Sequence, residues 1–336
     1  MDRRTFLSTI AGSLLSTSAP APIAPDTTSP APRFAAAVRY SAQHGGAALL
    51  IVRNGIVLAE DYGSGGPDAR WPLGKATRAL APLLAAQMVR DGILVMDEPV
   101  ALTLGEWGVD PSKSIITART LLNGTSGLAF PTGAPPTLAT ALALAQTDQV
   151  GVRFVDDAAP YVIFTEIARR KLVAAGVDPD PAMYLTTRTL DAIGCTPIGW
   201  ARQPDGAPHL DTGAFVSARG WAAVGEFVRR GGIWRADQLA DTFVLGDALR
   251  GSPAEPRAGF GFWLAGPSRQ PISCNSDLWR AQSPAPIDLA MAAGDGGQRL
   301  YVAPSHSLVI ARLTSSDAPN PQWSDAQFLS LLWPDL

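Results

Sequence analysis

Residues that commonly bind metals or form disulfides are scarce in this chain. Its 336 residues include three histidines and two cysteines. His44, His209 and His306 lie far apart in the sequence, without the spacing that metal sites use. We therefore predict no metal site and no cofactor. Cys195 and Cys274 are compatible with one disulfide or with two buried thiols.

An excess of positive charge is also missing. The chain has 27 Lys and Arg residues against 30 Asp and Glu residues, for a formal net charge of -3. Nucleic-acid-binding domains need a basic surface, so nucleic acid is excluded as a predicted partner. With 46% hydrophobic and 17% charged residues, the chain can bury a large core. One substantial domain is within the ordinary range for this length.

A long apolar run is missing as well, including at the N-terminus. Arg3 and Arg4 precede an apolar stretch without charge until Asp26. The stretch is too short and too rich in Ser and Thr for a membrane span, and it resembles a twin-arginine export signal. We predict that residues 1–33 are this signal and a Pro-rich tether, either cleaved or kept as an anchor. The predicted location is the periplasm or the exterior, where a disulfide is favourable.

Strand signals occur early and late in the chain. Residues 47–63 alternate around Asn54 and Gly55, a pair typical of a two-residue hairpin turn. Further strands are predicted at 259–265, 300–304 and 308–313, and a closing helix from Ala326.

The segment that begins at Trp71 reads WPLGKATRALAPLLAAQMVRDGILVMDEPV. It resembles the nucleophile helix of the serine beta-lactamase and penicillin-binding-protein superfamily, in the branch of class C beta-lactamases and related esterases. That family has the pattern Phe-x-x-Gly-Ser-x-Thr-Lys, and Gly74 and Thr77 match it. Lys75 stands where the family has its acylated serine. Arg78 stands where it has the lysine that helps to deprotonate the serine.

Four further segments resemble the family in the same order along the chain. They are TARTLLNGTSGL at 117–128, GVRFVDDAAPYVIFTEIARRKL from Gly151, DTGAFVSARGWAAVGEFVRRGGIW from Asp211 and AAGDGGQRLYVAPSHSLVIARL from Ala292. In the second segment, the family's motif tyrosine falls at or near Asp156, and Ala158 stands where an asparagine would follow.

The last segment carries a third altered motif. Gly294, Asp295, Gly296 and Gly297 stand where the family has Lys-Thr-Gly, His-x-Gly or a looser glycine-rich version. A glycine-rich strand end lets the backbone approach a ligand closely, but it supplies no cation. All three catalytic motifs of the family are therefore degenerate.

The resemblance implies an α/β fold of the α+β type. Its antiparallel sheet is flanked by helices and joined to a mostly helical subdomain. The domain is expected to cover residues 34–336, with the sheet region at 34–69 and 251–336 and the helical insertion at 70–250.

The residue types at the two main positions exclude acyl-serine chemistry there. A lysine ammonium has no free lone pair, and an arginine with a pKa above ~12 is no base near neutrality. Two neighbouring cations also need compensating negative charge. We expect an internal network in which Asp156, helped by Asp157 or Asp295, pairs with Lys75 and Arg78. Long cationic side chains that simply reach solvent are the alternative.

We therefore predict an exported beta-lactamase-related protein that has lost serine acylation. Its role would be non-catalytic binding of a small-molecule or cell-wall-type ligand, or an interaction in the cell envelope. The alternative is a serine hydrolase (an esterase, amidase or beta-lactamase-like enzyme) with displaced residues, such as Ser126 or Ser64 as nucleophile. A third option makes Lys75 itself reactive, since a helix N-terminus and Arg78 would lower its pKa. The sequence leaves the oligomeric state open.

Overall fold

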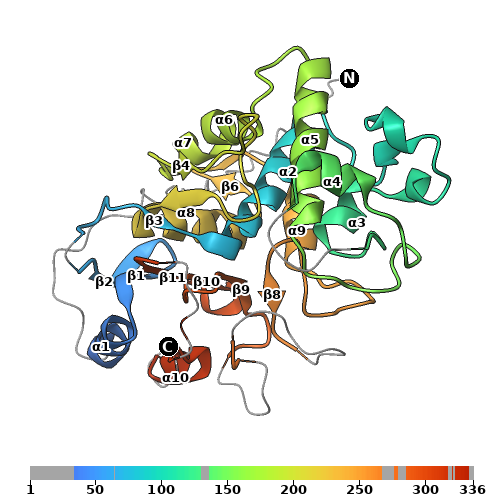
Figure 1. Cartoon of the computed structure of the whole chain (residues 1–336). Helices are drawn as coiled ribbons and strands as arrows, with labels where there is room; N and C mark the ends of the chain where they lie inside the picture. The colour runs from blue at the N-terminus through green and yellow to red at the C-terminus, as the bar shows by residue number, and fades with distance from the viewer. Residues whose placement is uncertain are drawn as a thin grey trace, which may run out of the picture.

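A six-stranded antiparallel sheet forms the centre of the fold (Figure 1). The computed structural model describes residues 34–63, 65–129, 136–266, 276–278, 285–316, 320 and 322–332. The strand order is β2-β1-β11-β10-β9-β8, so strands from the two ends of the sequence lie side by side. The strands are β1 (Gly46–Arg53), β2 (Ile56–Asp61), β8 (Trp263–Leu264), β9 (Ala290–Ala293), β10 (Arg299–Ala303) and β11 (Leu308–Thr314).

The hairpin between β1 and β2 turns at the predicted pair. Asn54 has φ 51° and Gly55 has φ 79°, the left-handed conformations that a type I′ turn requires. In β1, Leu50 and Val52 pack into one hydrophobic cluster and Ile51 into another. Because successive side chains of a strand point to opposite faces, both faces of the sheet are covered.

Helices cover the two faces of the sheet (Figure 1). On one face lie α1 (Ala35–Gln43) and α10 (Asp325–Ser330), and on the other lies α8 (Ala218–Arg229). A Cβ added to Gly225 of α8 would lie 2.5 Å from Val309 Cγ1. The missing side chain therefore lets α8 pack closely against β11.

A helical region lies between β2 and β8 in the sequence. Its main helices are η2 (Gly74–Leu80, a 3-10 helix), α2 (Ala81–Arg90), α3 (Ala118–Leu122), α4 (Leu138–Ala143), α5 (Ala159–Ala174), α6 (Pro181–Leu185), α7 (Asp191–Ile193) and α9 (Thr242–Ala248). Shorter helical turns are η3 (Val100–Leu102), η4 (Gly105–Trp107) and η5 (Lys113–Ile115), and η6 (Thr186–Leu190) is a π-helix. Short strands β3 (Trp71–Pro72), β4 (Gly199–Trp200) and β5 (Ala214–Val216) form a second sheet, and β6 (Ile233–Trp234) pairs with β7 (Asp237–Gln238). The predicted fold class is confirmed.

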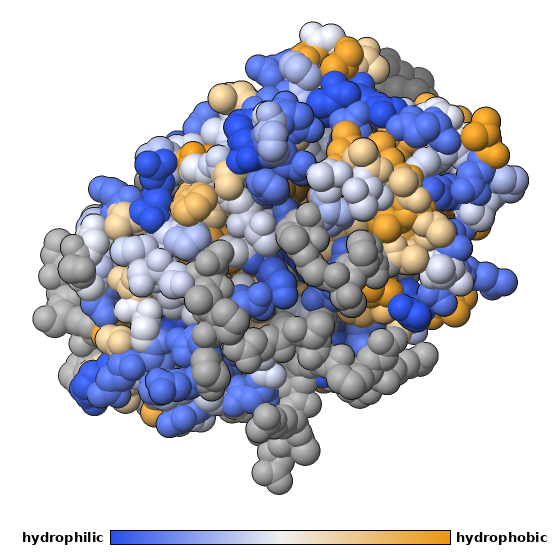
Figure 2. Space-filling model, viewed as in Figure 1, coloured by the Kyte–Doolittle hydropathy of each residue, from blue (hydrophilic) through white to orange (hydrophobic). Residues whose placement is uncertain are grey.

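The surface seen in Figure 2 is mostly hydrophilic, with apolar residues gathered over α3 and α4. Within the described part of the chain, no helix has the length and apolar character needed to cross a membrane. The predicted signal and tether at 1–33 lie outside the described residues.

Cys195 is a buried free thiol, and burial raises its pKa to about 12. Of the two alternatives, Cys195 therefore supports the buried thiol and not the disulfide. Its candidate partner, Cys274, lies outside the described residues.

Candidate functional site

The segment that carries Lys75 and Arg78 is a 3-10 helix, not the first turn of a longer α-helix. The α-helix α2 begins only at Ala81, and its second residue is Pro82. Proline has no N–H to donate to the carbonyl four residues back, which is that of Arg78. Three residues per turn place Lys75 and Arg78 on the same side of η2. Thr77 fixes this turn from behind, since its Oγ1 accepts a 3.2 Å hydrogen bond from the backbone N–H of Ala214.

Arg78 is buried and ion-paired with Asp156. Its Nη1 lies 2.5 Å from Asp156 Oδ1, and only 7% of the residue is exposed. Its guanidinium carbon also lies 5.0 Å from the centre of the Tyr161 ring. Burial alone would lower the pKa of Arg78, but the charges of Asp156 and of the other acidic groups nearby together outweigh it and raise the pKa. Arg78 is therefore a fixed cation.

Lys75 is paired with a different carboxylate, nearer to solvent. Its Nζ lies 3.1 Å from Asp295 Oδ2, and the two side chains are 42% and 34% exposed. The expected network is thus present as two separate ion pairs, an inner one at Arg78 and an outer one at Lys75. Asp157 makes no ion pair within the described part of the chain.

The third motif contributes a carboxylate and a close backbone contact. A Cβ added to Gly294 would lie 2.5 Å from the carbonyl oxygen of Leu73. The glycine is therefore needed for packing against the start of η2. Gly294 and Asp295 line the cavity beside the ion pairs, whereas Gly296 and Gly297 do not.

Sequence reasoning missed two buried polar residues beside Arg78. Tyr161, on α5, is buried, and burial raises the pKa of its phenol. Asp211 is 1% exposed; its carboxylate lies 3.7 Å from His209 Nδ1 and accepts no hydrogen bond from the described residues. No local pattern marks either residue. The one available signal was that both residues lie inside segments already matched to the family.

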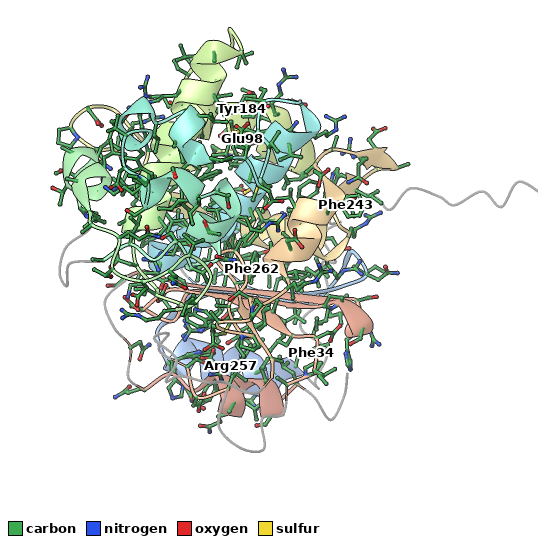
Figure 3. All side chains as sticks on the ribbon, turned by 90° about the vertical axis from the view of Figure 1, so that its right-hand side faces the viewer. Phe34, Glu98, Tyr184, Phe243, Arg257 and Phe262 are labelled. Atoms are coloured by element: carbon green, nitrogen blue, oxygen red, sulfur yellow. The ribbon has the colours of Figure 1, made fainter. Side chains whose placement is uncertain are left out.

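The cavity at the ion pairs is small. Its volume is about 40 Å³, whereas pockets for drug-sized ligands measure roughly 300–1,000 Å³. Phe154 and Trp263 form an edge-to-face pair at one wall, with ring centres 5.9 Å apart. Phe262 lies between the sheet and the helices (Figure 3). A Cβ added to Gly261 would lie 2.4 Å from the Arg78 carbonyl oxygen, so this loop packs tightly on η2.

The displaced nucleophile Ser126 is inaccessible. It has no exposed surface, does not line the cavity, and its hydroxyl has no hydrogen-bond partner among the described residues. Ser64, the other candidate, lies outside the described residues. Over the same described ranges, no cluster of three or more His, Cys, Asp or Glu side chains could hold a metal ion.

The chain matches a protein-family model over most of its length. The family model described as Beta-lactamase matches residues 33–331. No curated protein sequence matches the chain significantly.

Solved structures resemble the chain over most of its length. A penicillin-binding protein homologue from Caulobacter crescentus has 18% identity and a TM-score of 0.65, covering 91% of this chain and 97% of its own. The D-alanine carboxypeptidase AmpC from Burkholderia cenocepacia has 15% identity and a TM-score of 0.63, with 90% and 98% covered. A beta-lactamase from Mycobacterium bovis has 18% identity and a TM-score of 0.58, with 85% and 92% covered. At these identities the likeness is one of fold.

Proposed function

Because the chain belongs to the beta-lactamase family, we propose that it is an exported member that forms no acyl-serine intermediate and acts in the cell envelope by binding. The observation that carries the proposal is the pairing of both cations. Lys75 and Arg78 occupy the positions that resemble the family's serine and lysine, and each is held by a carboxylate. A side chain held in this way offers neither a hydroxyl nucleophile nor a base.

The size of the cavity supports the absence of an acyl-serine intermediate. The family acts on lactams, peptides and small esters, and about 40 Å³ holds only about three water molecules. Substrate binding in this cavity would require the outer pair, Lys75 and Asp295, to separate. The inner pair would still place an arginine, which is no base near neutrality, where the family has its lysine.

The displaced-nucleophile alternative has less support. Ser126 would have to become exposed before any ester or amide could reach its hydroxyl. Lys75 as a reactive amine is also disfavoured, because its Nζ is engaged with Asp295.

The proposal is tested by covalent labelling of the purified protein. We expect no turnover of a chromogenic cephalosporin or a p-nitrophenyl ester, and no labelling by a fluorophosphonate or a penicillin probe. The reason is the absence of a hydroxyl and a base at positions 75 and 78. Ser126→Ala is the matched control. Stoichiometric labelling that maps to any serine would overturn the proposal. If that serine is Ser126, the labelling should disappear in the Ser126→Ala variant.

A further inference from the structure

Helix α5 separates two cavities of very different size. Tyr161 lines the small cavity at the ion pairs, whereas its neighbour Val162 lines a cavity of about 460 Å³. The α5 residues Val162, Thr165, Glu166 and Arg169 line this larger cavity at the three- and four-residue spacing of one helix face. Its volume falls in the range of small-molecule sites, unlike that of the cavity at Arg78.

The walls of the larger cavity are partly apolar, and hydrogen bonds hold them in place. Besides Val162, they include Pro181 at the start of α6 and Pro208. Asp180 caps α6, with Oδ1 accepting hydrogen bonds from two backbone N–H groups at 2.9 and 3.2 Å. On the opposite side, Gln203 N–H donates to the Ala207 carbonyl at 2.8 Å. The cavity is therefore preformed, which lowers the entropy cost of binding.

The charges around this cavity do not cancel. Arg169 donates two hydrogen bonds, at 2.7 and 2.8 Å, to Glu166. Arg202 forms a 2.6 Å ion pair with Asp180. Asp205 also lines the cavity but has no ion pair with any described residue; its Oδ1 accepts only the Ala207 N–H, at 3.0 Å. Glu166 also pairs with Arg170 at 2.6 Å, and Arg170 pairs in turn with Glu106 at 2.8 Å. The three guanidinium groups of this network are outnumbered by four carboxylates, those of Glu106, Glu166, Asp180 and Asp205, so the surplus charge is negative.

We propose that this cavity binds a small organic cation, with its apolar body against Val162 and the prolines and its ammonium group at Asp205. An anion of the same shape would meet the surplus carboxylate and bind more weakly. The site is separate from the family cleft, so the inference goes beyond the proposed function. The labelling experiment leaves it unaffected, and the two can fail independently.

The test compares three ligands of similar shape by isothermal titration at low salt: hexylammonium, 1-hexanol and hexanoate. We expect hexylammonium to bind most tightly and hexanoate least tightly. Asp205→Asn should weaken hexylammonium binding about two- to fivefold, as for a partly exposed ion pair, and bring it to the level of hexanol. The matched control Asp237→Asn alters an exposed carboxylate on β7 that does not line the cavity, and should change nothing.

A second variant tests the location. Ala207→Phe projects a ring into the cavity from its half-buried rim and should abolish binding of all three ligands. Circular dichroism and thermal unfolding check that Ala207→Phe is folded. If Ala207→Phe does not fold, the Asp205→Asn result alone tests the location of the site. The proposal is overturned if no ligand binds, if hexanoate binds as tightly as hexylammonium, if Asp205→Asn has no effect, or if a folded Ala207→Phe binds normally.

Discussion

Two of the arginine–aspartate pairs in the molecule lie in contrasting surroundings, one between α10 and the sheet and one in the cleft. Arg299 and Asp325 are both fully buried, and Asp325 accepts hydrogen bonds from Arg299 Nε at 2.8 Å, from Trp323 Nε1 at 2.8 Å and from the Tyr301 hydroxyl. Asp156 in the cleft is 19% exposed, and Nε of its partner Arg78 is buried without a hydrogen-bond partner among the described residues.

The difference shows what each pair is built for. In the α10 pair, the charged groups of Arg299 and Asp325 are hydrogen-bonded to other protein groups. Removing one partner therefore leaves an unpaired charge in the core. The cleft pair is less completely satisfied and lies beside a cavity. The same two side-chain types therefore stabilise the fold in one region. In the other region, under our proposal, they occupy a former reaction position.

The largest expected effect is at the α10 pair. Asp325→Asn leaves the Arg299 guanidinium buried without its counter-charge, and should lower the free energy of unfolding by about 3 to 5 kcal/mol at pH 7. Chemical denaturation monitored by tryptophan fluorescence measures this change. A loss no larger than that of Asp156→Asn would show that the two pairs are energetically alike.

The same variant has a defined pH dependence. Burial alone raises the pKa of Asp325, but the Arg299 charge and the hydrogen bonds overcome this and hold the pKa below its usual 3.8. A lowered folded-state pKa means that the carboxylate stabilises the fold above about pH 3.8 and that this contribution is lost as the pH falls further. The difference between wild type and Asp325→Asn should therefore shrink below that pH.

An intermediate effect is expected at the inner cleft pair. Asp156→Asn leaves Arg78 buried and positive, but the partial exposure of Asp156 lets water compensate, so a loss of about 2 kcal/mol is expected. Asp157→Asn is the matched control. Burial raises the pKa of Asp157, so its charged form opposes folding at pH 7, and its stabilising form is present only at lower pH.

Asp157→Asn should therefore be neutral or slightly stabilising in the same denaturation assay. Equal losses in Asp156→Asn and Asp157→Asn would mean that Arg78 has no preferred partner. The distinction between an inner pair and a nearby carboxylate would then be wrong.

The smallest effect is expected at the outer pair. Lys75→Ala removes an ion pair whose two side chains are more than one third exposed, and should cost less than ~1 kcal/mol. Added salt should reduce the difference from wild type, because mobile ions screen exposed charges. Thermal unfolding at low and high salt provides the measurement. A salt-independent loss as large as that of Asp156→Asn would place Lys75 in a buried network.

Local sequence signals predicted the fold better than the site. Asn54 and Gly55 specify their hairpin through their own backbone preferences, and the strand at 308–313 is visible in its apolar run. The positions of Lys75 and Arg78 followed from the resemblance to a family motif. Tyr161 and Asp211 did not, because their approach to Arg78 results from long-range packing that leaves no periodic pattern.

The shape of the cavity was also beyond sequence reasoning. It depends on close backbone contacts at Gly261 and Gly294, where an added Cβ would lie only 2.4 and 2.5 Å from a carbonyl oxygen. A glycine in the sequence indicates that a close contact is allowed, but not which segment makes it. At Gly294 the segment that makes the close contact is the one that carries Leu73.

The separation into an outer and an inner ion pair also sets the order in which the cleft can be remodelled by single substitutions. Changing Lys75 first leaves Asp295 facing water, so that step is open to a laboratory evolution experiment. Changing Asp156 first leaves the buried Arg78 guanidinium without its counter-charge. Most such variants would then be too unstable to be selected before a second substitution occurs. Arg78→Lys keeps a positive charge but lacks the planar fork that meets Asp156. A library starting from this protein therefore has one accessible entry, at position 75.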